Sequence, residues 1–143
     1  MYKRQVSYLV DPDVGLVLEV DIAGDVPGIK PHEALAKMGK GPSILTYDST
    51  MIPNQLLKEF VIKVAEEVDI PYQLSIVARG GTDGGPIHLN RAGCPTIVIS
   101  VPTRHIHSHV SLLRLDDAEK TINLILELVK RLDEETVKGF TSL

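Results

Sequence analysis

Four short apolar runs, each bounded by glycine, proline or polar residues, dominate the hydrophobic pattern of this chain. Continuous runs of Leu, Val and Ile of this length are typical of β-strands that are buried on both faces. The four predicted strands are Gly15–Ala23, Ser43–Tyr47, Tyr72–Ala78 and Pro95–Val101. Between the first two lies Gly24–Gly41, where the density of glycine and proline predicts a long surface excursion.

Two stretches show helical periodicity instead. The first runs from a capping residue, Asn54, to about Val68, and it leaves Glu66 and Glu67 on its polar side. The second opens at Asp116, with Glu119 three residues on as a capping-box partner. Its predicted buried face comprises Leu115, Ala118, Ile122, Ile125, Leu126, Val129 and Leu132. The polar residues 133–143 that follow are expected to fray.

This order of strands and helices predicts an α/β fold with a mostly parallel sheet flanked by helices. No internal repeat or linker divides the 143 residues, so we expect one domain. Four strands with only two good helices form a thin sandwich, and we therefore expect this sheet to be part of a larger one.

Composition narrows the class of partner. The net charge of −4 and the 4% aromatic content argue against nucleic-acid binding. No apolar run reaches the length of a membrane-spanning helix, so no membrane partner is expected. The single cysteine, Cys94, rules out a disulfide framework and is interpreted as a buried structural thiol, which favours a reducing compartment such as the cytoplasm.

Polar residues follow three of the predicted strands. Asp21 ends the first strand, Thr82 and Asp83 lie in a glycine-rich turn after the third, and a histidine-rich loop follows the fourth. Ligands in open α/β sheets bind beyond the carboxyl ends of the strands. We therefore predict that these three loops converge on one edge of the sheet.

The loop after the fourth strand carries His105, His107 and His109 at alternate positions. In an extended segment this spacing places all three rings on one side, where imidazole nitrogens suit zinc, cobalt, nickel or manganese. An exposed histidine-rich loop without a ligand is an equally good interpretation of the spacing alone.

Glu19 and Asp21 share one face of the first strand. They form either a pair of functional carboxylates or acids at an exposed strand end, and for Glu19 we favour the second interpretation. The turn Gly80–Gly85 either carries Thr82 and Asp83 toward a ligand or is simply a tight turn. Glu66 and Glu67 are interpreted as solvated surface, and His32 and His88 as ordinary residues.

Six segments occur together and in order in a known family. They are Val20–Asp25 (VDIAGD), Gly39–Pro42 (GKGP), Tyr47–Asn54 (YDSTMIPN), Ile70–Gln73 (IPYQ), Gly80–Asp83 (GGTD) and Val101–His109 (VPTRHIHSH). Through them the chain, from about Tyr8 to Leu132, resembles the carboxyl-terminal part of the tetrahedral aminopeptidases, which include glutamyl and deblocking metallo-aminopeptidases and some proteins labelled endoglucanases.

The resemblance implies a zinc-peptidase-like catalytic domain that removes N-terminal residues from peptides by means of water activated by two divalent metal ions, zinc or cobalt. Asp21 matches a ligand of one metal and His107 a ligand of the other. Thr82 and Asp83 match a loop beside the substrate pocket. His105 departs from the pattern, where tyrosine is usual, and His109 matches no ligand.

The resemblance also implies that this chain is incomplete. The general-base glutamate and the other three ligands are expected upstream, so residues 1–143 would be the carboxyl-terminal part of one catalytic domain and inactive alone. Met1–Gln5 does not fit the family, and residues 1–7 are expected to be foreign or disordered. The complete protein is expected to form homo-oligomers. The alternatives are a non-catalytic metal-binding or interaction fragment, and a glycoside hydrolase, for which Glu19 and Asp21 are a poor pair.

Overall fold

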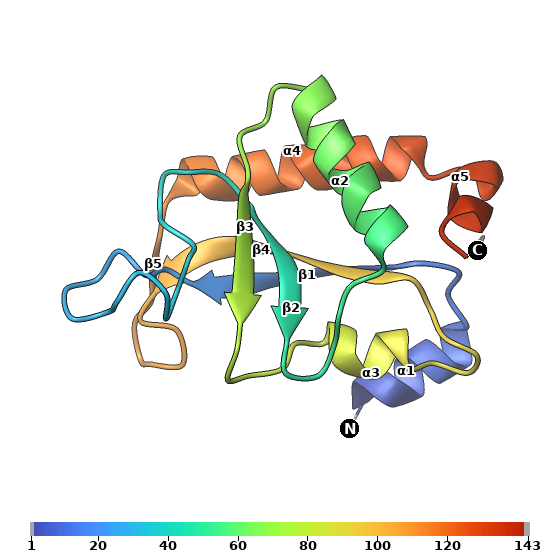
Figure 1. Ribbon diagram of the computed structural model, residues 1–143, viewed down its shortest axis with the longest axis horizontal. Coiled ribbons are helices and arrows are strands. Elements are labelled where there is room, and N and C mark those ends of the chain that lie inside the picture. Colours follow the sequence, from blue (N-terminus) through green and yellow to red (C-terminus); the bar gives the residue numbers. More distant parts are fainter. Residues whose placement is uncertain (1, 142–143) are drawn as a thin grey trace.

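The computed structural model describes residues 2–141, which form a mixed five-stranded sheet with helices on both faces (Figure 1). In chain order the elements are α1 (Tyr2–Val10), β1 (Gly15–Ile22), β2 (Ser43–Asp48), α2 (Gln55–Glu67), β3 (Gln73–Val77), α3 (Gly84–His88), β4 (Thr96–Arg104), β5 (Leu112–Leu113), α4 (Leu115–Arg131) and α5 (Glu134–Gly139). Helices α2 and α4 lie on one side of the sheet, and α1 and α3 on the other.

The strand order is β1-β4-β2-β3, with β5 paired to the end of β4. Strands β1 and β4 are parallel, as are β2 and β3, while β2 runs antiparallel to β4. The predicted α/β fold with a mostly parallel sheet is confirmed, and the reversal lies in the middle of the sheet. No helix within residues 2–141 is long and apolar enough to cross a membrane.

Alternate residues of the central strand β4 build two cores. Ile97 and Ile99 pack under α2 and α4, together with Leu124 and Leu128 of α4. Val98 points to the other face, where the second core forms beneath α3. This alternation is what a strand buried on both faces requires.

Helix α2 begins as predicted, because the Asn54 side chain accepts a hydrogen bond from the amide of Leu57 at 2.8 Å. Glu66 and Glu67 are exposed on it, and Cys94 is buried, both as predicted. The prediction of a capping box at Asp116 is wrong. Helix α4 begins at Leu115, and its cap residue, Arg114, makes no side-chain capping hydrogen bond.

The predicted buried face of α4 is confirmed only at Ile125 and Leu132, which are partly buried against the core. The residues that the chain buries on this helix are Asp117, Thr121, Leu124 and Leu128. The predicted stripe that includes Ile122, Leu126 and Val129 is exposed. The apolar arc of α4 is wider than the surface that the sheet covers, so periodicity identified the arc but not the part of it that is buried here.

Both ends of the chain are more ordered than expected. Residues 2–10 form α1, on which Lys3 forms an ion pair with Asp83; Met1 lies outside the described residues. At the other end the Asp133 side chain caps α5 by accepting from the amide of Thr136 at 2.8 Å. Phe140 is buried in the core, and its carbonyl accepts a hydrogen bond from Asn54. The expectations of disorder and fraying therefore differ from the structure between residues 2 and 141.

The excursion between β1 and β2 is held by one buried carboxylate. Asp117 of α4 accepts hydrogen bonds from the amides of Gly39 at 2.5 Å and Gly41 at 2.8 Å. Gly41 has φ +84°, and a Cβ there would lie 1.9 Å from the carbonyl oxygen of Pro71. A glycine is therefore required at this position, and Asp117 fixes the conformation around it.

Removing this carboxylate is expected to loosen the excursion. In Asp117→Ala the two glycine amides lose a charged acceptor in a buried place, and we expect a loss of about 2 kcal/mol in the free energy of unfolding. Urea unfolding measures it. The matched control is Asp116→Ala, whose exposed carboxylate pairs with Arg114 and whose loss should cost less than about 1 kcal/mol. Equal effects of the two substitutions would contradict this role of Asp117.

Candidate functional site

Asp21 is a buried carboxylate near the end of β1. Its exposed fraction is 5%. Oδ1 accepts from the amide of Ile22 at 2.7 Å, and Oδ2 accepts from the hydroxyl of Ser43 at 2.6 Å. None of the ion pairs within residues 2–141 includes Asp21. Asp21 is thus a buried acid, not one at an exposed strand end, and its charge has no cationic partner in this part of the chain.

A cavity of about 400 Å³ opens beside Asp21. It is lined by the end of β1, by part of the excursion and by the end of β3; the lining includes His32, Glu33, Ile76 and Arg79. The sequence predicts His32 to be an ordinary residue and indicates no role for Glu33 or Arg79. In the sequence, His32 and Glu33 lie between the first two predicted strands and Arg79 directly follows the third. These positions alone do not predict that the three residues lie near Asp21.

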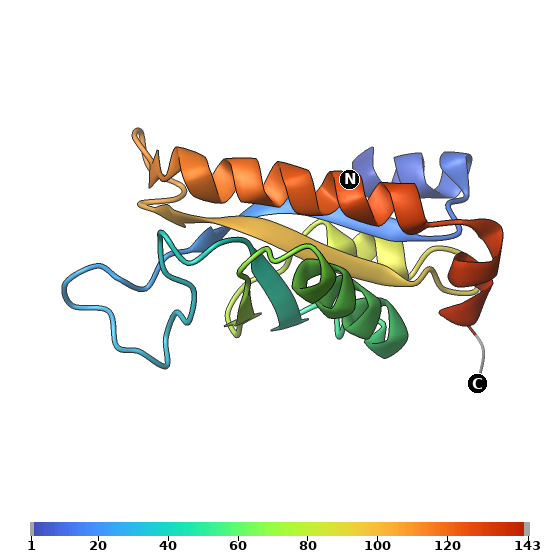
Figure 2. The ribbon, with the colours of Figure 1, turned by 90° about the horizontal axis from the view of Figure 1, so that it is seen from above.

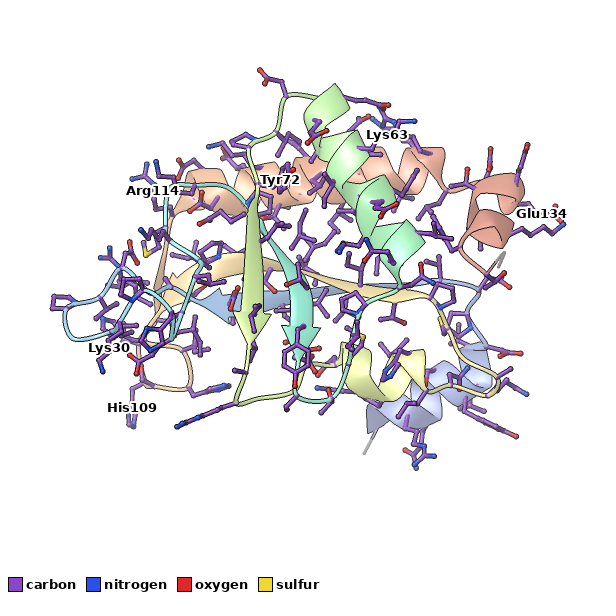
Figure 3. The ribbon with its side chains drawn as sticks, in the orientation of Figure 1. Lys30, Lys63, Tyr72, His109, Arg114 and Glu134 are labelled. Carbon is purple, nitrogen blue, oxygen red and sulfur yellow. The ribbon has the colours of Figure 1, made fainter. Side chains whose placement is uncertain are left out.

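The histidine loop is a tight hairpin between β4 and β5, not an extended segment. His105 and His107 have left-handed backbone conformations, with φ of 59° and 61°. The extended conformation in which alternate spacing would align the three rings is therefore not the one found between residues 105 and 109. His105, His107 and His109 are exposed, and Figure 3 shows His109 at the same end of the molecule as Lys30, which lies on the excursion after β1.

The end of β1 and this hairpin leave the sheet together. Asp21 is the register partner of Pro102, and the amide of Ala23 donates to the carbonyl of Thr103 at 3.0 Å. His107 follows Thr103 by four residues, and Figure 1 shows the arrowheads of β1 and β4 at the same end. The backbone thus brings the two predicted ligands to one end of the sheet.

An ion pair ties the two loops to each other at that end. Arg104 donates from Nε and from its terminal nitrogen to the two oxygens of Asp25, at 3.1 and 2.6 Å. These hydrogen bonds hold the pKa of Asp25 below its ordinary value. A paired guanidinium and carboxylate of this geometry fix the start of the hairpin relative to the excursion.

Thr82 and Asp83 contact β1 at Glu19 rather than at Asp21. Strand β3 runs antiparallel to β4, yet the residues at its carboxyl end line the cavity beside Asp21. In the turn that follows β3, the Asp83 amide donates to Glu19 at 2.6 Å. Glu19 lies two residues before Asp21 on the same face of β1, and burial raises the pKa of its carboxyl above the ordinary value. Neither Thr82 nor Asp83 lines the Asp21 cavity.

Asp48, a residue without an assigned role in the sequence analysis, organises that turn. Its Oδ2 accepts from the amide and hydroxyl of Thr82 at 3.1 and 2.6 Å, and its Oδ1 accepts from the amide and hydroxyl of Thr50. Burial acts to raise the pKa of Asp48, but these hydrogen bonds outweigh it and the pKa lies below the ordinary value. The carboxylate form therefore joins the loops that follow β2 and β3.

The lowered pKa makes the contribution of Asp48 to stability depend on pH. A carboxyl with a lower pKa in the folded state stabilises the fold above its unfolded pKa of about 3.9, and this stabilisation is lost as the pH falls through the folded pKa. We expect the stability difference between the wild type and Asp48→Asn to shrink between about pH 5 and pH 2. Urea unfolding over this range measures it, with the exposed Asp13→Asn as control. A constant difference would contradict the assignment.

Within residues 2–141, no three His, Cys, Asp or Glu side chains gather closely enough to hold a metal ion. Asp21 and the hairpin lie at one end of the sheet, but His107 does not line the Asp21 cavity. The described residues therefore provide donors of suitable chemistry at one place without forming a complete metal centre by themselves.

The fold of the described residues is shared with solved aminopeptidases. The TET aminopeptidase of the marine sediment archaeon Thaumarchaeota archaeon SCGC AB-539-E09 superposes with a TM-score of 0.95 and 68% identity, over 97% of this chain and 39% of its own. An aminopeptidase from Desulfurococcus kamchatkensis gives a TM-score of 0.93 at 32% identity, over 99% of this chain and 40% of its own.

Residues 3–124 match the M42 glutamyl aminopeptidase family, and the chain belongs to that family. The lysyl aminopeptidase of Pyrococcus furiosus is 35% identical over 90% of this chain and 36% of its own length. The chain spans 34–38% of the length of the curated relatives that it matches. The family match begins at Lys3, inside the segment expected to be foreign.

Proposed function

We propose that the complete protein is a metal-dependent aminopeptidase and that this chain supplies two of its metal ligands, Asp21 and His107. The observation that carries the proposal is the buried Asp21 carboxylate, which has no cationic partner within residues 2–141 and lies at the end of the sheet from which the His107 hairpin leaves. Membership of the M42 family supports the same conclusion.

The residues present fit divalent metal ions in part. A carboxylate oxygen and a neutral imidazole nitrogen are common zinc ligands, and they also suit cobalt. The hydrogen bonds from Ser43 and Ile22 orient the Asp21 carboxylate and leave lone pairs of its oxygens for a cation. Two donors do not complete a catalytic site, so the remaining ligands and the general-base glutamate would come from residues outside this chain.

Two metal ions, when bound, would lower the pKa of a water molecule and so supply the nucleophile that hydrolyses the first peptide bond. Asp21 and His107 would each hold one of these ions. The cavity beside Asp21, with Arg79, Glu33 and His32 on its walls, offers polar groups to the bound peptide. The turn at Thr82 and Asp83, fixed by Asp48, borders the same sheet face and would line the outer part of the substrate pocket.

Homo-oligomeric assembly of the complete protein is part of the proposal. Two structural relatives at 27 and 28% identity, TET1 peptidases, are described as a dodecamer and as assemblies with a tetrahedral or octahedral shell. The chain covers 36% of each of them. Light scattering of the complete protein measures the mass of its assembly and so tests whether it forms homo-oligomers.

The chain of 143 residues alone is expected to show no peptidase activity, because the proposed base and three ligands are not in it. Hydrolysis of leucyl and glutamyl p-nitroanilides, with and without added zinc or cobalt, measures this. The complete protein is the matched comparison and should turn over at least one of these substrates in a metal-dependent way. Robust turnover by the 143-residue chain would contradict the partial-site assignment.

A further inference from the structure

Two buried serine hydroxyls extend the surroundings of Asp21 across the sheet. Ser43 of β2 and Ser75 of β3, here called the serine pair, are 0 and 1% exposed, and their hydroxyl oxygens lie 2.7 Å apart. The Ser43 hydroxyl also lies 2.6 Å from Oδ2 of Asp21. Figure 2 shows β4, in gold, between β1 and β2, so the three side chains form a row that joins β1, β2 and β3 across β4.

The hydrogen bonds in this row have one direction. A carboxylate only accepts hydrogen bonds, so Ser43 donates its one hydroxyl proton to Asp21. The second hydrogen bond must then use the proton of Ser75, which donates to the hydroxyl oxygen of Ser43. The Ser75 hydroxyl thus holds the Ser43 hydroxyl in the orientation in which it donates to Asp21.

Other buried hydroxyls of the described chain bond locally. Those of Thr96, Thr103 and Thr121 each donate to a backbone carbonyl two or four residues earlier in the sequence. Such a bond satisfies a buried hydroxyl without linking distant parts of the chain. Ser43 instead bonds to side chains that lie 22 and 32 residues away in the sequence. Its contacts therefore fix particular side chains on other strands, and the one that carries a charge is Asp21.

We propose that the serine pair positions Asp21 to bind its metal ion, with Ser43 acting directly on the carboxylate and Ser75 acting through Ser43. The inference rests on the proposed function, in which Asp21 is a metal ligand. The Ile22 amide holds Oδ1 and the Ser43 hydroxyl holds Oδ2, so the carboxylate cannot rotate without losing both hydrogen bonds. Partners of this kind orient a ligand before the metal binds and so raise the affinity of the site.

The serine pair also connects Asp21 to the wall of the cavity beside it. Ser75 lies on β3 and is followed directly by residues 76–79, which line that cavity. The cavity wall and the proposed metal ligand are thereby held in one arrangement. Ser75 is expected to affect metal binding even though Ser43 lies between it and Asp21.

The test titrates the metal-free complete protein with Co²⁺ and follows the visible absorption of the bound ion. Ser43→Ala should weaken one of the two cobalt sites at least about tenfold and change the absorption spectrum of the ion bound there. Ser75→Ala should weaken the same site at least about threefold. In the double variant the loss should equal that of Ser43→Ala alone, because Ser75 acts through Ser43.

Thr96→Val is the matched control, because it removes a buried hydroxyl of the same sheet that donates to the carbonyl of Cys94. Its cobalt dissociation constants should stay within about twofold of those of the wild type. Circular dichroism checks that the variants fold. Asp21→Asn tests the proposed function separately and should remove one of the two cobalt ions.

Unchanged cobalt binding in Ser43→Ala and Ser75→Ala, together with the loss of one ion in Asp21→Asn, would overturn the inference and leave the proposed function in place. Two ions in Asp21→Asn would overturn both. Additive losses in the double variant would overturn the action of Ser75 through Ser43. Equal weakening in Thr96→Val would reduce the effect of the serines to sheet stability and would also overturn the inference.

Discussion

His107→Ala is expected to lower the metal content of the complete protein from about two ions to about one per active site. The imidazole of His107 is the proposed ligand of one metal, whereas Asp21 serves the other, so only one position should empty. Because both ions would act on the attacking water in the proposed mechanism, peptidase activity should fall at least about 100-fold. Elemental analysis after dialysis measures the first effect, and hydrolysis of an aminoacyl p-nitroanilide measures the second.

The hairpin offers a matched control for this experiment. His109 lies two residues away in the same exposed loop and is not a proposed ligand. His109→Ala should keep both ions and an activity within about twofold of the wild type. Two ions per site in His107→Ala would contradict the assignment, as would equal metal loss in the two variants.

Leu128→Ala is expected to destabilise the 143-residue chain by about 2–5 kcal/mol. Leu128 is fully buried between α4 and the sheet, where it packs in one core with Ile97 and Leu124. Truncation removes apolar contacts and leaves a cavity that the surrounding residues fill only in part. Urea unfolding, followed by circular dichroism, measures the change.

Leu126→Ala is the control on the same helix. Leu126 is exposed, so its truncation should change the stability of the isolated chain by less than about 0.5 kcal/mol. The periodicity of the sequence makes the opposite prediction, since Leu126 belongs to the stripe that we first expected to be buried. A larger loss for Leu126→Ala than for Leu128→Ala would therefore show that α4 packs with that stripe inward.

The strands are the elements that sequence patterns predict well, although only β2 and β4 are buried along most of their length and β1 and β3 are partly exposed. The observed bounds of β1, β2, β3 and β4 lie within three residues of the predicted ones. Short continuous apolar runs between turn residues are typical of strands and are too short for most helices. The direction of β2 relative to β4 is not encoded in such a pattern, since it depends on which way the intervening chain crosses the sheet. The end of β3 nevertheless reaches the cavity beside Asp21, whereas Thr82 and Asp83 beyond it do not line that cavity.

The polar residues that hold the site together were harder to predict. Asp117 is buried and the side chain of Asp116 is 41% exposed, although the two are adjacent and identical in type. Their difference comes from the amides of Gly39 and Gly41, which approach only in the folded chain. The left-handed conformation of His107 is likewise a property of the hairpin, and spacing alone cannot distinguish it from an extended segment.

The candidate metal ligands were predicted from a family resemblance, and their shared position has partial support from the fold. The parallel pairing of β1 with β4 places Asp21 opposite Pro102, at the end where the histidine hairpin begins. Membership of the M42 family confirms the resemblance. The roles of Asp21 and His107 stay predictions.

The most direct measurement is an anomalous-scattering map of the complete protein, crystallised with zinc and recorded at the zinc absorption edge. The account predicts two peaks about 3.5–4 Å apart, one about 2.0–2.2 Å from an Asp21 carboxylate oxygen and the other at a similar distance from a ring nitrogen of His107. A map in which Asp21 and His107 face different cavities, with no zinc bound to either, would contradict it.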